Sequence, residues 1–379
     1  MLYLDFAASS PIREKALNVL EVSFRENFAN PSSTHKLGKE LHRRIETCRS
    51  HLLEFVGAGN TYRLIFTSSA TESNNTVTKG LNLGAGDSVI FSTADHPSIT
   101  APMTQLKESG VTLIEMPLDE YGAVRENQLM SLIDEKVKLV NLTHVNNQSG
   151  TINDITGISR LVKNLNPQTH IHVDAAQGFG KVPFTLQEGN IDSLSTSAHK
   201  TGGPKGIAGL YLHDNTSIRP LITGGGQEDG LRSSTQAAPL VFSFYEAAKE
   251  SVEGIESMVH HVAGTNRVAR ECLKEKIPEI SFPFWKKSSP YILAFLLPGI
   301  SSDIILRHLE QQDIIISSRA ACSSRIKGLH PVFSALNLPE KVHKFVLRLS
   351  FSHVTTNEDI FHFCNALATI YDDLKRFIR

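Results

Sequence analysis

The feature that most constrains the fold of this chain is an alternation of short apolar runs with helical patterns over its first two thirds. The runs expected as strands are Tyr62–Thr67, Ser88–Ser92, Val111–Glu115, Val137–Leu142, His170–Val173, Ile191–Ser195 and Ile207–Leu212. Helical segments lie between them, such as 97–109 and 155–165. Strands that are apolar at nearly every position are typically buried on both faces. The pattern therefore predicts an α/β fold with a mostly parallel seven-stranded sheet and helices on both faces.

A long helical pattern after Pro239 separates this region from the rest of the chain. Apolar residues recur every three or four positions from Val241 to Val262, which predicts one helix that joins two domains. Shorter patterns follow over 291–297, 302–311, 314–317 and 345–350. We therefore expect a large domain over 15–250, and a smaller α+β domain formed by 1–14 together with 251–379.

Composition argues against several classes of partner and location. Lys and Arg number 38 against 39 Asp and Glu, so the chain has no basic excess for nucleic acid. The longest apolar stretch, 291–297, is far shorter than the ~20 residues of a membrane span. The N-terminus lacks the basic and apolar parts of a signal peptide, and the four scattered cysteines form no CxxC pair. We expect a cytoplasmic protein that binds neither nucleic acid nor membrane and has no disulfide framework.

The clearest local signal is SAHKTGGPKG at 197–206, where Lys200 follows the end of an expected strand. A lysine at a strand end, beneath Gly-rich backbone, is well placed to form a Schiff base with an aldehyde cofactor. The alternative is an ordinary loop lysine. The segment is not a phosphate-binding loop of the GxxxxGK[ST] type, which occurs nowhere in the chain.

A second signal is HIHVDAAQ at 170–177, where Asp174 closes an apolar strand. Open α/β sheets bind ligands at the carboxyl ends of their strands. A carboxylate there favours the protonated form of a pyridine nitrogen, which makes the ring of pyridoxal phosphate an electron sink. The alternative is a metal site on His170 and His172, but no further ligands stand at convincing positions, so we expect no metal.

A third signal is FTSSATESNN at 66–75, where a strand leads through hydroxyl residues into a helix. Free N–H groups and hydroxyls at a helix N-terminus bind phosphate. The simpler interpretation is a helix cap on Ser69 or Thr71. A phosphate cradle, a carboxylate and a lysine are together what one molecule of pyridoxal phosphate requires.

At this point the chain resembles a known family, the cysteine desulfurases within the class V aminotransferases of pyridoxal phosphate (PLP) fold type I. The motifs that carry the resemblance are LDFAASSP at 4–11, NPSSTHKLG at 30–38, FTSSATESNN at 66–75, DHPS at 95–98, HVNN at 144–147, HVDAAQ at 172–177, SAHKTGGPKG at 197–206, GGGQE at 224–228, GLRSST at 230–235 and AACSS at 320–324. They span nearly the whole chain. The resemblance implies conversion of L-cysteine to L-alanine, with the sulfur passed on as an enzyme persulfide.

The resemblance also implies roles around the cofactor. Lys200 would hold PLP covalently and then move protons, Asp174 would pair with the ring nitrogen, and His96 would stack on the ring. Gln177 would bond the phenolic oxygen. The phosphate would be held by Ala70, Thr71, Ser197, His199 and, from the second subunit of a homodimer, Thr235.

For the substrate, the resemblance implies that Asn147, which also borders the cofactor, and Arg348 receive the carboxylate of cysteine. The planar guanidinium of arginine binds a carboxylate through two hydrogen bonds. Without the resemblance, the alternating strand pattern around Arg348 predicts a surface arginine.

Sulfur transfer is implied for Cys322, which stands in a stretch of small residues without apolar periodicity, typical of a loop. Arg319 and Arg325 flank it, and positive charge favours the reactive thiolate. The expected partners are a sulfur-acceptor protein or an iron–sulfur scaffold. Cys48, Cys272 and Cys364 lie in helical patterns and are expected to be packing residues.

The sequence departs from the family pattern at Gln148, Asp229 and Ser234, and at the pair Arg319 and Ala320 before the cysteine. These changes put the phosphate contact across the dimer and the docking of acceptors in question. Two alternatives stay open: another PLP enzyme of this fold, such as a selenocysteine lyase or an aminotransferase, or a non-catalytic protein that binds partners.

Overall fold

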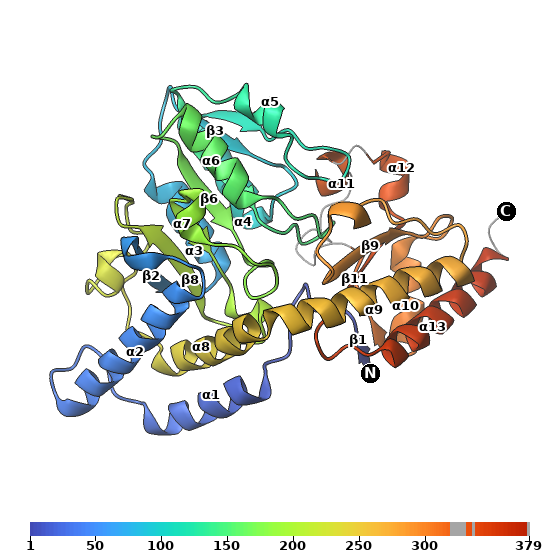
Figure 1. Cartoon of the computed structure of the whole chain (residues 1–379), viewed down its shortest axis with the longest axis horizontal. Helices are drawn as coiled ribbons and strands as arrows, with labels where there is room; N and C mark the ends of the chain where they lie inside the picture. The colour runs from blue at the N-terminus through green and yellow to red at the C-terminus, as the bar shows by residue number, and fades with distance from the viewer. Residues whose placement is uncertain (319–330, 336–337, 377–379) are drawn as a thin grey trace.

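The structure, a computed structural model, describes residues 1–318, 331–335 and 338–376. Within these residues a seven-stranded sheet forms the centre of the larger part of the molecule (Figure 1). Its strand order is β2-β8-β7-β6-β5-β3-β4. The strands are β2 (Tyr62–Thr67), β3 (Ser88–Phe91), β4 (Thr112–Glu115), β5 (Val137–Thr143), β6 (His170–Asp174), β7 (Ser193–Ser195) and β8 (Ala208–His213). Only β8 runs antiparallel to its neighbours in this sheet, so the predicted mostly parallel sheet is confirmed.

Helices cover both faces of this sheet (Figure 1). They are α1 (Glu14–Glu26), α2 (Lys36–Glu54), α3 (Ala70–Gly80), α4 (Pro97–Glu108), α5 (Glu126–Met130), α6 (Ile155–Leu165), α7 (Leu186–Gly189) and α8 (Ala238–Glu253). Successive residues of a strand point to opposite faces. Leu64 and Phe66 accordingly pack in the core that α2, α6 and α8 share, whereas Ile65 between them packs beside α3. Cys48 belongs to the first of these cores, as its helical stripe predicts.

The register of the sheet brings polar residues together at its carboxyl edge. Thr143 at the end of β5 pairs with Asp174 at the end of β6, and Asp174 pairs in turn with Ser195 at the end of β7. Asp174 therefore stands in the middle of a row of strand ends, the position where this class of sheet binds its ligands.

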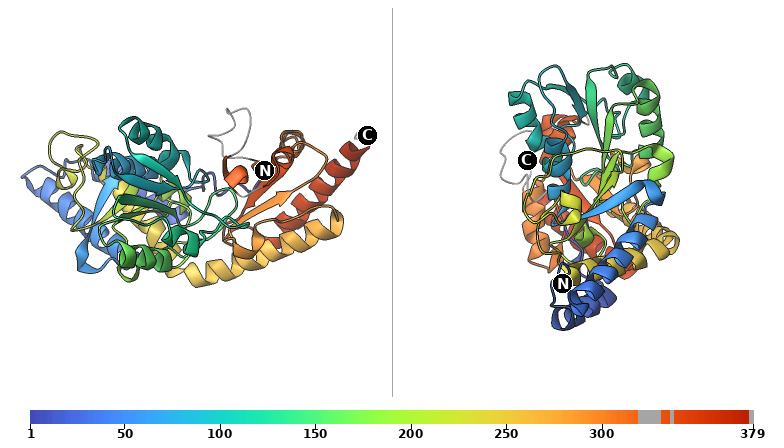
Figure 2. Two further views of the ribbon diagram at one scale, coloured as in Figure 1. Left: turned by 90° about the horizontal axis from the view of Figure 1, so that it is seen from above. Right: turned by 90° about the vertical axis from the view of Figure 1, so that its left-hand side faces the viewer.

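The second part of the molecule lies beyond α8, and Figure 2 shows it as a separate lobe reached along α8 and α9. Its elements are α9 (Ile255–Lys276), β9 (Ile292–Leu296), α10 (Ser302–Glu310), β10 (Ile314–Ile315), α11 (Pro331–Ala335), α12 (Glu340–His343), β11 (Val346–Ser350) and α13 (Asn357–Lys375). The expectation of one helix over 241–262 is wrong. The helix breaks at Gly254, where a Cβ atom would stand 2.7 Å from the end of the Met258 side chain.

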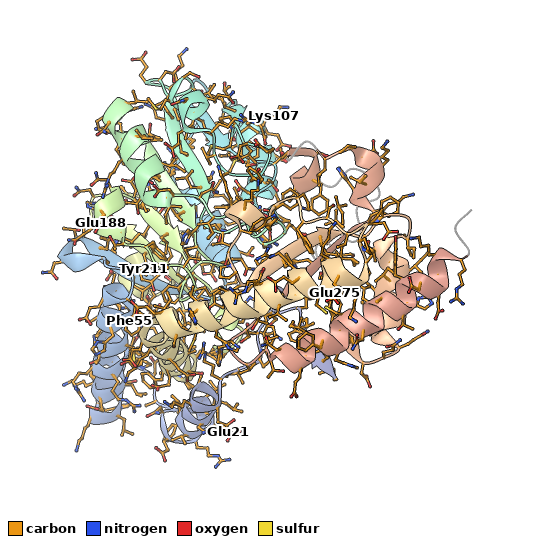
Figure 3. The ribbon with its side chains drawn as sticks, turned by 45° about the vertical axis from the view of Figure 1, so that its right-hand side comes forward. Glu21, Phe55, Lys107, Glu188, Tyr211 and Glu275 are labelled. Carbon is orange, nitrogen blue, oxygen red and sulfur yellow. The ribbon has the colours of Figure 1, made fainter. Side chains whose placement is uncertain are left out.

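Two small sheets and a separate apolar core hold this lobe. β11 pairs antiparallel with β9, and the N-terminal strand β1 (Leu2–Tyr3) pairs parallel with β10. Cys272 and Cys364 are buried in this core, so their expected packing role is confirmed. Figure 3 labels one residue from the core and one from the surface. Tyr211 on β8 is fully buried, whereas Glu275 on α9 is exposed. No helix in the described part of the chain is long and apolar enough to cross a membrane.

Candidate active site

A cavity of about 300 Å³ opens at the carboxyl edge of the sheet. Its lining comes from the N-terminal segment, the starts of α3 and α4, the ends of β5 and β6, the loop after β7, and β11 of the other lobe. The predicted site residues that line it are Ala70, Thr71, His96, Asn147, Asp174, Gln177, Ser197, His199, Lys200 and Arg348. Residues far apart in the sequence thus meet in one place. Thr235 does not line it, and Cys322 lies outside the described residues.

Lys200 stands at the end of a short 3-10 turn, Ala198–Lys200, which follows β7. Its Nζ atom donates to the carbonyl oxygens of Ala7, at 2.5 Å, and Ala8, at 2.6 Å. Gln177 donates from Nε2 to the same Ala7 oxygen at 2.8 Å, and its Oε1 is buried without a partner among the described residues. The N-terminal segment therefore forms the wall against which the amine is held.

Asp174 closes β6 and is only 8% exposed. One carboxylate oxygen accepts from the backbone N–H of Ala176 at 3.0 Å, and the other accepts from Nδ2 of Asn74 at 2.9 Å. A buried carboxylate that accepts two hydrogen bonds suits a cationic partner on its open side.

His96 is the N-cap of α4, and Pro97 takes the first helical position after it. Its Nδ1 atom accepts from the backbone N–H of Ser98 at 3.1 Å and lies 2.8 Å from the Ser98 hydroxyl. Burial lowers the pKa of His96, although the negative charge of Asp174 opposes that shift. The ring is therefore neutral at neutral pH, with Nδ1 committed as an acceptor.

The start of α3 supplies the phosphate side of the cavity. Ser69 caps this helix by accepting from the N–H of Glu72, while Ala70 and Thr71 occupy its first turn, where N–H groups lack acceptors within the helix. His199 lines the same cavity, and burial, together with neighbouring lysines, lowers its pKa to about 4. The neutral imidazole of His199 and the free N–H groups at the start of α3 are suited to the oxygens of a phosphate group.

The alternating strand pattern around Arg348 predicted a surface arginine, and this prediction is wrong. Arg348 is buried, with only 3% of its surface exposed. Its Nη1 donates to the carbonyl of Asn147 and its Nη2 to Oδ1 of Asp5, both at 2.6 Å. Its Nε is buried without a partner among the described residues. The guanidinium is thus oriented by the two lobes and the N-terminal segment together.

Two residues of the site were missed from the sequence, Asn74 and Asp5. Asn74 is fully buried on the inner face of α3, and its amide contacts both Asp174 and Ser98. Asp5 closes the apolar run Leu2–Leu4 just as Asp174 closes β6, and that parallel was the available signal. For Asn74 the sequence offered no signal beyond the helix start.

Thr235 is exposed and lies in the segment that follows β8. This segment is anchored by Glu228, whose carboxylate accepts from Arg49, from the N–H of Phe66 and from Gln236. Two residues here depart from the family pattern. Ser234 is exposed and its hydroxyl accepts from Arg232, and Asp229 adopts a left-handed φ of 55°.

The remaining departures fall in different places. Gln148 is 2% exposed and belongs to a turn that Asn146 holds by accepting from two backbone N–H groups. Arg319 and Ala320 lie outside the described residues. The rival metal interpretation has no further support here. His170 and His172 both contact Ser193, and the described residues contain no group of three or more metal-binding side chains.

Comparison with known proteins places this chain in a family. Residues 2–363 match the model of the class-V aminotransferases. The NifS/IcsS protein homolog of Lactobacillus delbrueckii is 32% identical, over 99% of this chain and 98% of that protein. The cysteine desulfurase IscS of Rickettsia typhi is 30% identical, over 99% of this chain and 92% of that protein.

Solved structures agree with these relatives. A NifS-like protein superposes with a TM-score of 0.91 at 29% identity, covering 98% of this chain and 99% of that one. The structure of SspA in complex with cysteine gives a TM-score of 0.79 at 28% identity, covering 94% of this chain and all of that one.

The chain is thus a class-V aminotransferase, which is a PLP-dependent class of enzyme. Within that class, the chain belongs to the cysteine desulfurase family of NifS and IscS type.

Proposed function

We propose that this protein is a cysteine desulfurase, which takes sulfur from L-cysteine and releases L-alanine. The observation that carries the proposal is that one cavity brings together the amine of Lys200, the carboxylate of Asp174 and the guanidinium of Arg348. These groups suit, in order, an aldehyde, a pyridinium and an α-carboxylate.

The side chains of the cavity fit PLP. Asp174 would keep the ring nitrogen protonated, and the start of α3 would hold the phosphate. Gln177 donates one amide hydrogen to Ala7, and its second would go to the phenolic oxygen. Ser197, His199 and Asn147 would border the cofactor. When bound, PLP supplies the electron sink for the bonds at the substrate Cα atom.

The chain's own residues would then divide the remaining work. Arg348 would orient the substrate through its carboxylate, together with Asn147. Lys200 would carry the proton that leaves and returns at the substrate carbon, and the neutral ring of His96 would cover the cofactor and hold a proton at Nε2. Cys322 would receive the sulfur and pass it from a persulfide to an acceptor protein, such as an iron–sulfur scaffold. We place this reaction in the cytoplasm, where thiols stay reduced.

Incubation of the purified protein with L-cysteine and a reductant tests this function directly. We expect alanine and sulfide in equal amounts. A preference for selenocysteine over cysteine would favour the lyase alternative, and transfer of the amino group to a keto acid would favour an aminotransferase. The absence of any product from PLP-loaded protein would favour a non-catalytic partner-binding role.

Arg348→Lys should raise the KM for cysteine by about 10–100-fold and leave kcat changed less, because a lysine keeps the charge but loses the paired hydrogen bonds. The measurement is a cysteine titration of sulfide release. Arg270→Lys is the matched control, since Arg270 lies on α9 and stacks on Trp285 away from the cavity. An unchanged KM in Arg348→Lys would remove Arg348 from substrate binding.

The proposal includes a homodimer in which Thr235 completes the phosphate site of the neighbouring subunit. Its support is that Thr235 is exposed and off the cavity of its own chain, on a segment anchored by Glu228. Thr235→Ala should weaken PLP binding about tenfold or more, the size of one hydrogen bond to a charged group. A PLP-loaded, active monomer in sedimentation at micromolar concentration would contradict this arrangement.

A further inference from the structure

A line of buried polar side chains leads from Asp174 away from the cavity, along one face of the sheet, to the opposite, amino edge of β6. We call it the polar chain, and its members are Asn74, His172, Ser193 and His170. All are at most 8% exposed, and three of them are fully buried. Asp174 Oδ2 lies 2.9 Å from Asn74 Nδ2, and Asn74 Oδ1 lies 2.9 Å from His172 Nε2. Ser193 Oγ then lies 2.8 Å from His172 Nδ1 and 2.7 Å from His170 Nε2.

The direction of each hydrogen bond in the polar chain follows from the one before it. A carboxylate only accepts, so Asn74 must present its NH₂ group to Asp174 and therefore its oxygen to His172. His172 must then carry its proton on Nε2. Burial lowers the pKa of both His172 and His170 to about 3, so both rings are neutral and have one donor and one acceptor each. Nδ1 of His172 is accordingly an acceptor for the Ser193 hydroxyl.

The outer end of the polar chain is fixed in the same way. Because the Ser193 hydroxyl hydrogen points to His172, its oxygen accepts from Nε2 of His170. The Nδ1 atom of His170 is left as an acceptor, and His170, the first residue of β6, lines an open groove at the amino edge of the sheet. Lys163 and Asp192, which pair with each other at 2.7 Å, line the same groove. Every N–H and O–H in the series therefore points towards Asp174.

The polar chain also has a branch to His96. The second hydrogen of the Asn74 amide goes to Ser98 Oγ at 2.8 Å, so the Ser98 hydroxyl is free to donate to His96 Nδ1, also at 2.8 Å. His96 must then hold its proton on Nε2. The Asn74 amide thus gives Asp174 its donor and, through Ser98, supports the His96 tautomer that the backbone N–H of Ser98 also requires.

We propose that the polar chain is a positioning device, which orients the Asp174 carboxylate towards the ring nitrogen of the cofactor and, through Ser98, reinforces the Nε2–H tautomer of His96. Asn74 is its central positioning residue, and Ser193 and His170 act on the site through His172. The statement about the cofactor rests on the proposed PLP function, whereas the statement about tautomers concerns the protein alone.

The first test uses the cofactor-free protein with ¹⁵N-labelled histidine rings, whose long-range ¹⁵N–¹H NMR correlations report the tautomer of each ring. We expect Nε2–H for His96, His170 and His172. A proton on Nδ1 of His96 or His172 would overturn the proposal, because the directed series would then be broken. This readout needs neither bound PLP nor activity, so it stays decisive if the proposed function fails.

The second test separates positioning from mere packing. Asn74→Ala should weaken PLP binding about tenfold, the size of one charge-assisted hydrogen bond, while the backbone N–H of Ser98 keeps the His96 tautomer. Ser193→Ala should shift the ring nitrogen signals of His172 and His170, and that of ¹⁵N-labelled PLP, whereas Ser193→Thr keeps the hydroxyl and should restore all three. Ser159→Ala is the matched control, because Ser159 is a fully buried serine on α6 whose hydroxyl has no hydrogen-bond partner among the described residues.

The outcomes are distinguishable even if Asn74→Ala does not fold, since the Ser193 pair then decides. A Ser193→Ala protein that differs from wild type only by a lower unfolding temperature, with the same ring signals as Ser159→Ala, would show a packing role and overturn the proposal. Failure of the wild-type protein to bind PLP would instead refute the proposed function.

Discussion

Lys200→Ala should give a folded, colourless protein that binds PLP weakly and does not retain it after borohydride treatment. Its rate of sulfide release should fall by at least about 10²–10⁴-fold. The reason is that the variant loses the group that both attaches the cofactor and moves the proton. In the structure the Lys200 amine is oriented by the carbonyls of Ala7 and Ala8, opposite the strand end that carries Asp174. The absorption spectrum and mass spectrometry of the reduced protein measure the effect.

Two other lysines make the test specific. Lys181 lines a neighbouring cavity of about 550 Å³ that also reaches Lys200, and burial lowers its pKa to about 7, so it is a second amine that could react with an aldehyde. Lys205 is exposed in the same glycine-rich loop as Lys200. Lys181→Ala and Lys205→Ala should both stay yellow. A colourless Lys181→Ala protein beside a yellow Lys200→Ala protein would move the attachment point to Lys181.

The sheet could be predicted from the sequence because each strand is a continuous apolar run bounded by turn residues, and such runs leave few alternatives to a buried strand. The break at Gly254 could not, since a glycine is tolerated inside many helices and the apolar period continues across it. Whether the helix bends there depends on the contacts of Met258 and Glu250, which only the folded chain shows.

Lys200 and Asp174 were predicted from their places at strand ends, whereas Asn74 was missed because it stands on a buried helix face. Lys200 and Asp174 follow apolar runs, so topology alone brings them to one edge of the sheet. Arg348 was misjudged because strand alternation gives the face of a side chain but not what covers that face, and Asp5, more than 300 positions away, covers it here. Asn74 has the same difficulty, because a polar residue on a helix is more often a solvated one.

Cys322→Ser should keep the yellow colour and the spectral change on adding cysteine. It should release sulfide at least about 10³-fold more slowly than the wild type and carry no persulfide. Binding of the cofactor and of the substrate carboxylate depends on residues of the cavity, and none of those that line it is a cysteine in the described part of the chain. Accepting the sulfur is a separate task, which requires a thiolate that can reach the substrate.

The structure strengthens this prediction through the other three cysteines. Cys48 is buried between α2 and the sheet, and burial raises its pKa to about 12, so its thiol stays protonated. Cys364 is buried beside Cys272 in the core of the second lobe, and burial with that neighbour raises its pKa as well. Cys322, flanked in sequence by Arg319 and Arg325, is left as the candidate.

Cys48→Ala is the control and should turn over normally at some cost in unfolding temperature. A persulfide found by mass spectrometry on Cys48, Cys272 or Cys364, or normal turnover by Cys322→Ser, would remove Cys322 from sulfur transfer and favour the lyase reaction, in which no loop thiol is required.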